Sequence, residues 1–164
     1  MARRVFFSFH YARDIFRVSQ VRNSGITKGG YEQAGFIDHA DWESIERQGD
    51  EAIKRWINGQ LGGASVTVVL IGADTFDRRW VNYEIQQSYS DGKGMLGIYI
   101  HQLIDPRTGR ADNKGRNPFE KFYIVDSNPR RQLNELYPAY DWVSDNGYAN
   151  FSKWVETAAR QAGR

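Results

Sequence analysis

Cysteine is missing from this chain of 164 residues, and so is any long hydrophobic run. Without cysteine, disulfides and thiolate chemistry are excluded, and nothing points to secretion. No stretch approaches the ~18 apolar residues that a membrane span needs. The chain starts with basic residues, but the apolar run after them is far shorter than the core of a signal peptide. We therefore expect a cytoplasmic protein that does not bind membranes.

An excess of charge of one sign is also missing. The chain has 22 Lys and Arg against 20 Asp and Glu, and no run of basic residues is longer than two. Such a weak, scattered positive charge does not indicate nucleic-acid binding. The length suits one domain with a proper core, so we expect a single domain over residues 1–164.

Common cofactor motifs are absent as well. The sequence has no G-x-x-x-x-G-K-[ST] phosphate loop and no G-x-G-x-x-G at the start of its first predicted helix. A dehydrogenase that recycles a dinucleotide cofactor is therefore disfavoured. His39 and His101 are isolated, without metal-ligand spacing around them. We expect neither a metal nor a bound cofactor.

Three short apolar runs predict strands that are buried on both faces. The most apolar is "SVTVVLIG" at residues 65–72, and the others are residues 3–9 and 95–101. Runs without strict alternation are typical of a parallel sheet covered by helices. Weaker apolar stretches at 34–38 and 137–143 predict two further strands.

Amphipathic segments alternate with these strands. The alternation predicts right-handed crossovers and a flavodoxin-like α/β fold, with helices on both faces of about five mostly parallel strands in the order 2-1-3-4-5. In this fold the ligand crevice lies beyond the carboxyl ends of the central strands. The predicted helices are residues 12–23, 42–61 (capped by Asp41), 77–90 and 147–159, and the predicted loops are residues 24–30 and 102–118.

The stretch "RRWVNYEIQQ" (residues 78–87) follows the most apolar strand. On a helix, Trp80 and Glu84 are four residues apart and share one face. Arg78 and Arg79 are unfavourable in a first helical turn, but a helix N-terminus with an added arginine suits a diphosphate. The alternative is two solvated arginines paired with Asp74 or Asp77.

With "RVFFSFHY" at the start, "SVTVVLIG…TFDRRWVNYEI" in the middle and "YDWVSDNGYANFSKWV" near the end, the chain resembles the TIR fold. More specifically, it resembles the TIR-like proteins of bacterial Thoeris anti-phage systems, over most of its length. In TIR enzymes a Trp-x-x-x-Glu motif opens the helix after the third strand and supplies the catalytic glutamate. The motif falls here on Trp80 and Glu84.

This resemblance implies that NAD is a substrate, cleaved between nicotinamide and ribose, and that Glu84 is catalytic. It also implies a cyclic ADP-ribose-type signal that activates a separate effector protein, and self-association on activation. Nicotinamide leaves as a neutral molecule, so no acid is needed and one carboxylate can suffice, unlike in ordinary glycosidases. The alternative for Glu84 is a solvated carboxylate near a helix N-terminus.

The resemblance also suggests which residues contact the substrate. Trp80 either stacks on a substrate ring or packs in the core. Trp42 either lines the pocket or packs in the core. His10 either hydrogen-bonds the substrate or is a cap or an exposed residue. The predicted substrate-binding residues are Phe9, His10, Asp38, Trp42, Trp80, Tyr83 and Arg78.

Two other functions remain open from the sequence. A non-catalytic TIR module that signals by self-association would keep its function after Glu84→Gln. An enzyme like a nucleoside deoxyribosyltransferase, with Glu84 as nucleophile, would exchange bases on deoxynucleosides and leave NAD intact.

Overall fold

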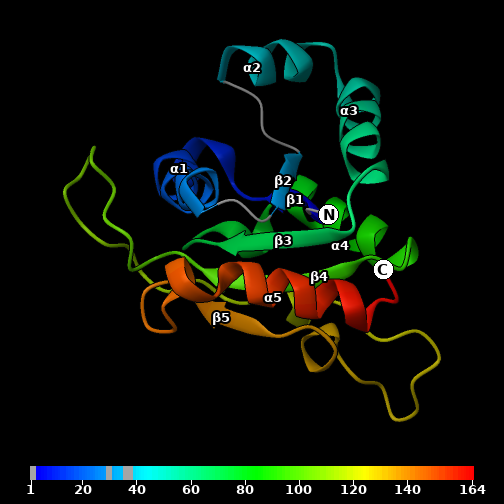
Figure 1. Cartoon of the computed structure of the whole chain (residues 1–164). Helices are drawn as coiled ribbons and strands as arrows, with labels where there is room; N and C mark the ends of the chain where they lie inside the picture. The colour runs from blue at the N-terminus through cyan, green and yellow to red at the C-terminus, as the bar shows by residue number, and fades with distance from the viewer. Residues whose placement is uncertain (1–2, 29–30, 35–38) are drawn as a thin grey trace.

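A parallel sheet forms the centre of the molecule (Figure 1). The computed structural model describes residues 3–28, 31–34 and 39–164. Its five strands are all parallel, in the order β2-β1-β3-β4-β5, which confirms the predicted flavodoxin-like arrangement. The strands are β1 (Arg3–Ser8), β2 (Tyr31–Ala34), β3 (Val66–Ile71), β4 (Gly94–Tyr99) and β5 (Ala139–Asp141).

Helices connect the first four strands, whereas 3-10 turns lie between β4 and β5, and the last helix follows β5. The helices are α1 (Tyr11–Lys28), α2 (His39–Arg47), α3 (Asp50–Gly62), α4 (Arg79–Ser90) and α5 (Gly147–Gln161). Short 3-10 turns occur at Thr75–Asp77, Pro118–Lys121 and Leu133–Glu135. None of the helices in the described part of the chain has the length and apolar character to cross a membrane.

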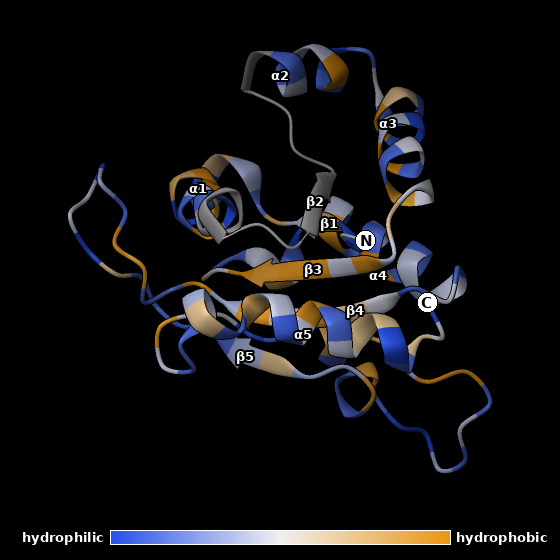
Figure 2. Ribbon diagram, in the orientation of Figure 1, coloured by the Kyte–Doolittle hydropathy of each residue, from blue (hydrophilic) through white to orange (hydrophobic). Residues whose placement is uncertain are grey.

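The core has two sides because side chains alternate along each strand. Every residue of β3 is buried, and the strand is almost continuously hydrophobic in Figure 2. Val68 and Leu70 pack in a cluster with α1 and α5. On the opposite face Val69 packs with α4, and Phe6 of β1 packs with α3. The sheet is therefore covered on both faces, as predicted.

The predicted helix over residues 42–61 is wrong in one respect: it is two helices. Gly49 lies between α2 and α3 with φ +95°, a backbone conformation that favours glycine. The bend turns α2 away from the direction of α3 (Figure 1). Because α2 begins at His39, Asp41 lies in its first turn and does not cap it.

Two other boundaries differ from the prediction. Residues 24–28, predicted as loop, continue α1, and the Ser24 hydroxyl donates to the Val21 carbonyl at 2.6 Å. The second strand lies at Tyr31–Ala34 instead of residues 34–38. Residues 35–38, including Asp38, lie outside the described residues.

Candidate active site

A cleft of about 440 Å³ opens beside the carboxyl end of β1. It lies where β1 leads into α1 and where α4 begins, the position at which open parallel sheets bind ligands. Most of the predicted site residues meet here, although they come from three separate segments of the chain. The cleft is lined by Phe9, His10, Tyr11, Ala12, Trp42, Glu43, Glu46, Arg78, Arg79, Trp80, Val81 and Glu84.

Glu84 is the buried acid of this cleft. It lies on the inward face of α4, next to Ile85, and only 7% of its surface is exposed. Its Oε2 atom has no hydrogen-bond partner within the described residues. Burial raises the pKa of Glu84 to about 8, although the neighbouring Ser8 hydroxyl lowers it somewhat. At neutral pH the side chain is therefore mostly protonated, and it is not a solvated helix carboxylate.

Aromatic rings form the wall of the cleft opposite α4. The ring centroids of Phe9 and Tyr11 are 5.7 Å apart, and Tyr11 stacks on Trp42 at 6.3 Å. Trp42 in turn meets Trp56 of α3 edge-on at 5.6 Å. A smaller hollow of about 30 Å³ lies among these rings and also reaches Glu84. Trp42 thus packs on its neighbours and lines the cleft at the same time.

Trp80 is half-buried at the opening of α4 and lines the cleft. The Arg79 guanidinium lies 4.5 Å from its ring centroid, and the Tyr83 ring packs edge-on at 5.7 Å. Tyr83 does not line the cleft, in contrast to the prediction that it contacts substrate. Its hydroxyl donates to Asn58 Oδ1 at 3.0 Å, so Tyr83 joins α4 to α3 behind Trp80.

The two arginines at the start of α4 have different partners. The exposed Arg78 donates through Nε to the Asp74 carbonyl at 3.4 Å, while Arg79 pairs with Asp50 of α3 at 2.6 Å. The predicted alternative, side-chain ion pairs with Asp74 or Asp77, is not found among the described residues. Arg78 therefore lies at the edge of the cleft without a carboxylate partner among the described residues.

His10 faces the same edge. Its Nδ1 atom is buried and has no hydrogen-bond partner in the described structure. Burial lowers the pKa of His10, and the positive charge of Arg78 lowers it further. His10 is therefore a neutral imidazole at neutral pH, and it lines the cleft.

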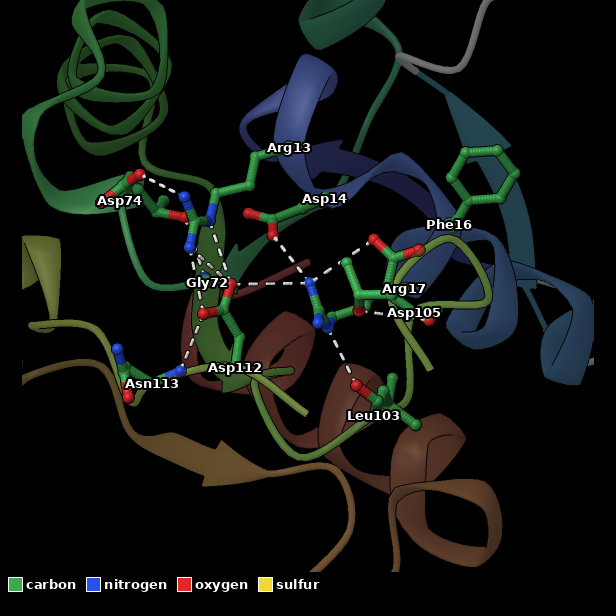
Figure 3. Close-up of polar contacts among 12 residues, drawn as sticks. Arg13, Asp14, Phe16, Arg17, Gly72, Asp74, Leu103, Asp105, Asp112 and Asn113 are labelled. Carbon is green, nitrogen blue, oxygen red and sulfur yellow. Dashed lines mark hydrogen bonds and ion pairs between the residues drawn. The ribbon is translucent and has the colours of Figure 1, made fainter. Parts of the chain in front are cut away.

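A network of ion pairs fixes the long loop after β4 beside the cleft (Figure 3). Arg13 of α1 bridges Asp74 and Asp112, each at 2.9 Å. Arg17, 4% exposed, donates to the carbonyls of Leu103 and Arg110. The loop prediction for residues 102–118 holds for most of the segment, because regular structure returns only with the 3-10 turn at Pro118.

Asp14 lies inside this network and has 0% exposure. Neither of its carboxyl oxygens has a hydrogen-bond partner within the described residues, and burial raises its pKa to about 6. Sequence analysis missed this network because its members are up to 99 residues apart. The spacing of Asp14 and Arg17, three residues apart on a helix, is a local signal of it.

Across residues 3–28, 31–34 and 39–164, no group of three or more His, Cys, Asp or Glu side chains is placed to hold a metal ion. The chemical groups of the cleft include a buried acid, a neutral imidazole, aromatic faces and an arginine without a carboxylate partner among the described residues. Asp38 cannot be placed in it, because it lies outside the described residues.

Comparison with known proteins bears on the identity of the chain. Residues 6–105 match the family model described as "Thoeris protein ThsB, TIR-like domain". The chain is also similar to the "Putative cyclic ADP-D-ribose synthase ThsB1" of Bacillus cereus (strain MSX-D12). The two are 39% identical over an alignment of 192 residues that covers 94% of this chain and all of that protein. The chain belongs to the ThsB TIR-like family of Thoeris proteins.

Proposed function

We propose that this protein cleaves NAD at the bond between nicotinamide and ribose and closes the remaining ADP-ribose into a cyclic product. The observation that carries the proposal is Glu84, a buried carboxyl whose Oε2 atom has no hydrogen-bond partner among the described residues, in a cleft with aromatic walls. The name of the Bacillus cereus relative, a cyclic ADP-D-ribose synthase, supports the same chemistry.

The protonation state of Glu84 fits a cationic substrate. In the free protein, burial holds the pKa of Glu84 at about 8. The nicotinamide ring of bound NAD carries a positive charge, and an opposite charge at close range favours the ionised carboxylate. We propose that NAD binding releases the Glu84 proton to solvent and leaves a carboxylate beside the ribose.

Bond cleavage then needs no second carboxyl group. The electron pair of the bond leaves with the nicotinamide nitrogen, so nicotinamide departs as a neutral molecule. Positive charge develops on the ribose, and the fixed Glu84 carboxylate stabilises it in a site of low dielectric constant. An internal nucleophile of the ADP-ribose then bonds to the same ribose carbon and closes the ring.

Ring closure requires that the nucleophile reaches the ribose before water does. The stacked rings of Phe9, Tyr11 and Trp42 give the cleft a wall that repels water. We propose that Trp80 stacks on a substrate ring, that Arg78 binds the diphosphate and that His10 hydrogen-bonds the substrate. We also propose that the product is a diffusible cyclic nucleotide that activates a separate effector protein.

Product analysis of the wild-type protein tests this proposal. The purified protein is incubated with NAD, alone and with extract of phage-infected cells, and the products are identified by mass spectrometry. We expect nicotinamide together with a cyclic isomer of ADP-ribose. Linear ADP-ribose alone would contradict cyclisation, and base exchange on deoxynucleosides with intact NAD would indicate a deoxyribosyltransferase. If NAD is not consumed even in the infected extract, the enzymatic function is wrong.

A further inference from the structure

Ser8 is a buried polar residue next to Glu84 with no assigned role. It is the last residue of β1, has 0% exposure, and its hydroxyl oxygen has no hydrogen-bond partner within the described residues. A buried polar atom without a partner costs free energy, so it is rare unless it serves a function. Two such atoms, Ser8 Oγ and Glu84 Oε2, occur at this one place.

The geometry of the sheet explains why these groups meet. Ser8 pairs in register with Val69 of β3, and Val69 packs against Val81 and Ile85 of α4. Ser8 therefore points to the face of the sheet that α4 covers, where Glu84 follows Val81 by three residues on the inward face of the helix. Glu84 lines the cleft and Ser8 does not, so Ser8 lies behind the carboxyl as seen from a ligand.

We propose that Ser8 is a positioning residue that donates its hydroxyl hydrogen to the Glu84 carboxylate once that side chain is ionised. The role in catalysis rests on the proposed function, but the contact between the two side chains does not. In the free protein the hydroxyl is close enough to lower the pKa of Glu84 without meeting hydrogen-bond geometry. Loss of the proton adds an acceptor, and a hydrogen bond to a charged acceptor is about twice as strong as a neutral one.

The other ionisable groups of the cleft leave this contact undisturbed. The pKa of Glu84 is set by burial and by Ser8. The remaining ionisable side chains that line the cleft, from the segment after β1 and from α2 and α4, are His10, Tyr11, Glu43, Glu46, Arg78 and Arg79. A change at Ser8 is therefore expected to act on Glu84 directly.

The experiment measures the pH at which Glu84 titrates in the folded protein without substrate. Urea unfolding from pH 4 to 10 is compared for proteins with Glu84 and with Glu84→Gln. The pH at which the stability difference stops growing gives the titration midpoint of Glu84 in the folded protein. The same two proteins are then measured with the additional substitution Ser8→Ala. We expect Ser8→Ala to move the midpoint upward by about one pH unit, a tenfold change in the ionisation constant. Ser8→Thr, which keeps the hydroxyl, should restore it.

Ser88→Ala is the matched control. Ser88 is equally buried, but its hydroxyl is bonded to Thr67 at 2.7 Å, so its loss should lower stability without moving the midpoint. An unchanged midpoint in Ser8→Ala overturns the proposal. If Ser8→Ala does not fold, Ser8→Gly replaces it, because glycine also lacks the hydroxyl, and an unchanged midpoint there has the same meaning.

The role of Ser8 in catalysis is tested separately, through the acidic limb of the pH profile of kcat/KM for NAD. In Ser8→Ala this limb should move to higher pH together with the titration midpoint of Glu84, and in Ser8→Thr it should return to the wild-type pH. A limb that stays in place while the midpoint moves would refute the role of Ser8 in turnover. Absence of NAD turnover in the wild type would instead refute the proposed function, and the stability titration would still decide on the contact.

Discussion

Replacing Glu84 by Gln should make the protein more stable, and the gain should grow with pH. The pKa of Glu84 is about 8 in the folded protein against an ordinary value of 4.5. Between these two values the unfolded chain has released its proton and the folded chain still holds it. Stability therefore falls as pH rises through this window, and the loss is complete above pH 8. A glutamine side chain cannot ionise, so the Glu84→Gln variant does not lose this stability as pH rises.

The expected size follows from the same two values. Each pH unit between about 5 and 8 should widen the gap by about 1.4 kcal/mol, towards an upper bound of about 5 kcal/mol at pH 9. Water that enters through the cleft reduces this figure. Urea unfolding of both proteins across this range provides the test, and other titrating groups such as Asp14 cancel in the difference. Two parallel stability curves would refute the raised pKa of a buried acid at this position.

Two further predictions concern the cleft and the network beside it. Trp80→Ala should weaken NAD binding by about 10- to 100-fold, because stacking on a base is worth about 1–3 kcal/mol. Trp80→Phe should retain most of the binding. Equal KM values for the wild type and both variants would contradict the stacking role. Gly72→Ala should cost about 1–3 kcal/mol of unfolding free energy, since the new methyl group would meet the buried Asp14 carboxyl. The control is Gly59→Ala, because Gly59 lies on the exposed side of α3 and a methyl group there would meet no neighbour within 4 Å. This variant should gain about 0.5–1 kcal/mol of unfolding free energy. Urea midpoints in the reverse order would contradict this packing.

The sheet could be predicted from the sequence because its central strands are buried on both faces. Val66–Ile71 is wholly apolar apart from Thr67, and such a run is typical of a strand buried on both faces of a parallel sheet. The helix boundaries could be predicted less well from the sequence. Gly49 interrupts a continuous amphipathic pattern through one positive φ angle, which hydrophobic periodicity does not record. The residues beyond Asn23 extend α1 although Gly25 lowers helix propensity.

Only part of the candidate site could be predicted from the sequence. Trp80 and Glu84 could be found because their spacing and their position after a buried strand are local features. Tyr83 lies on the same short helix but turns toward Asn58 of α3, and that choice depends on packing between helices. The unpaired hydroxyl of Ser8 also has no sequence signal, because its significance depends on what α4 places over the sheet.

The rate of nicotinamide release from NAD by Glu84→Gln tests the central claim most directly. The variant and the wild type are assayed in extract of phage-infected cells, with Glu51→Gln as the control because Glu51 is an exposed glutamate of α3 that does not line the cleft. We predict that Glu84→Gln lowers the rate by at least 10²–10³-fold, the effect of removing one group that stabilises transition-state charge, while Glu51→Gln retains it. An equal rate of release in Glu84→Gln and the wild type would contradict the account.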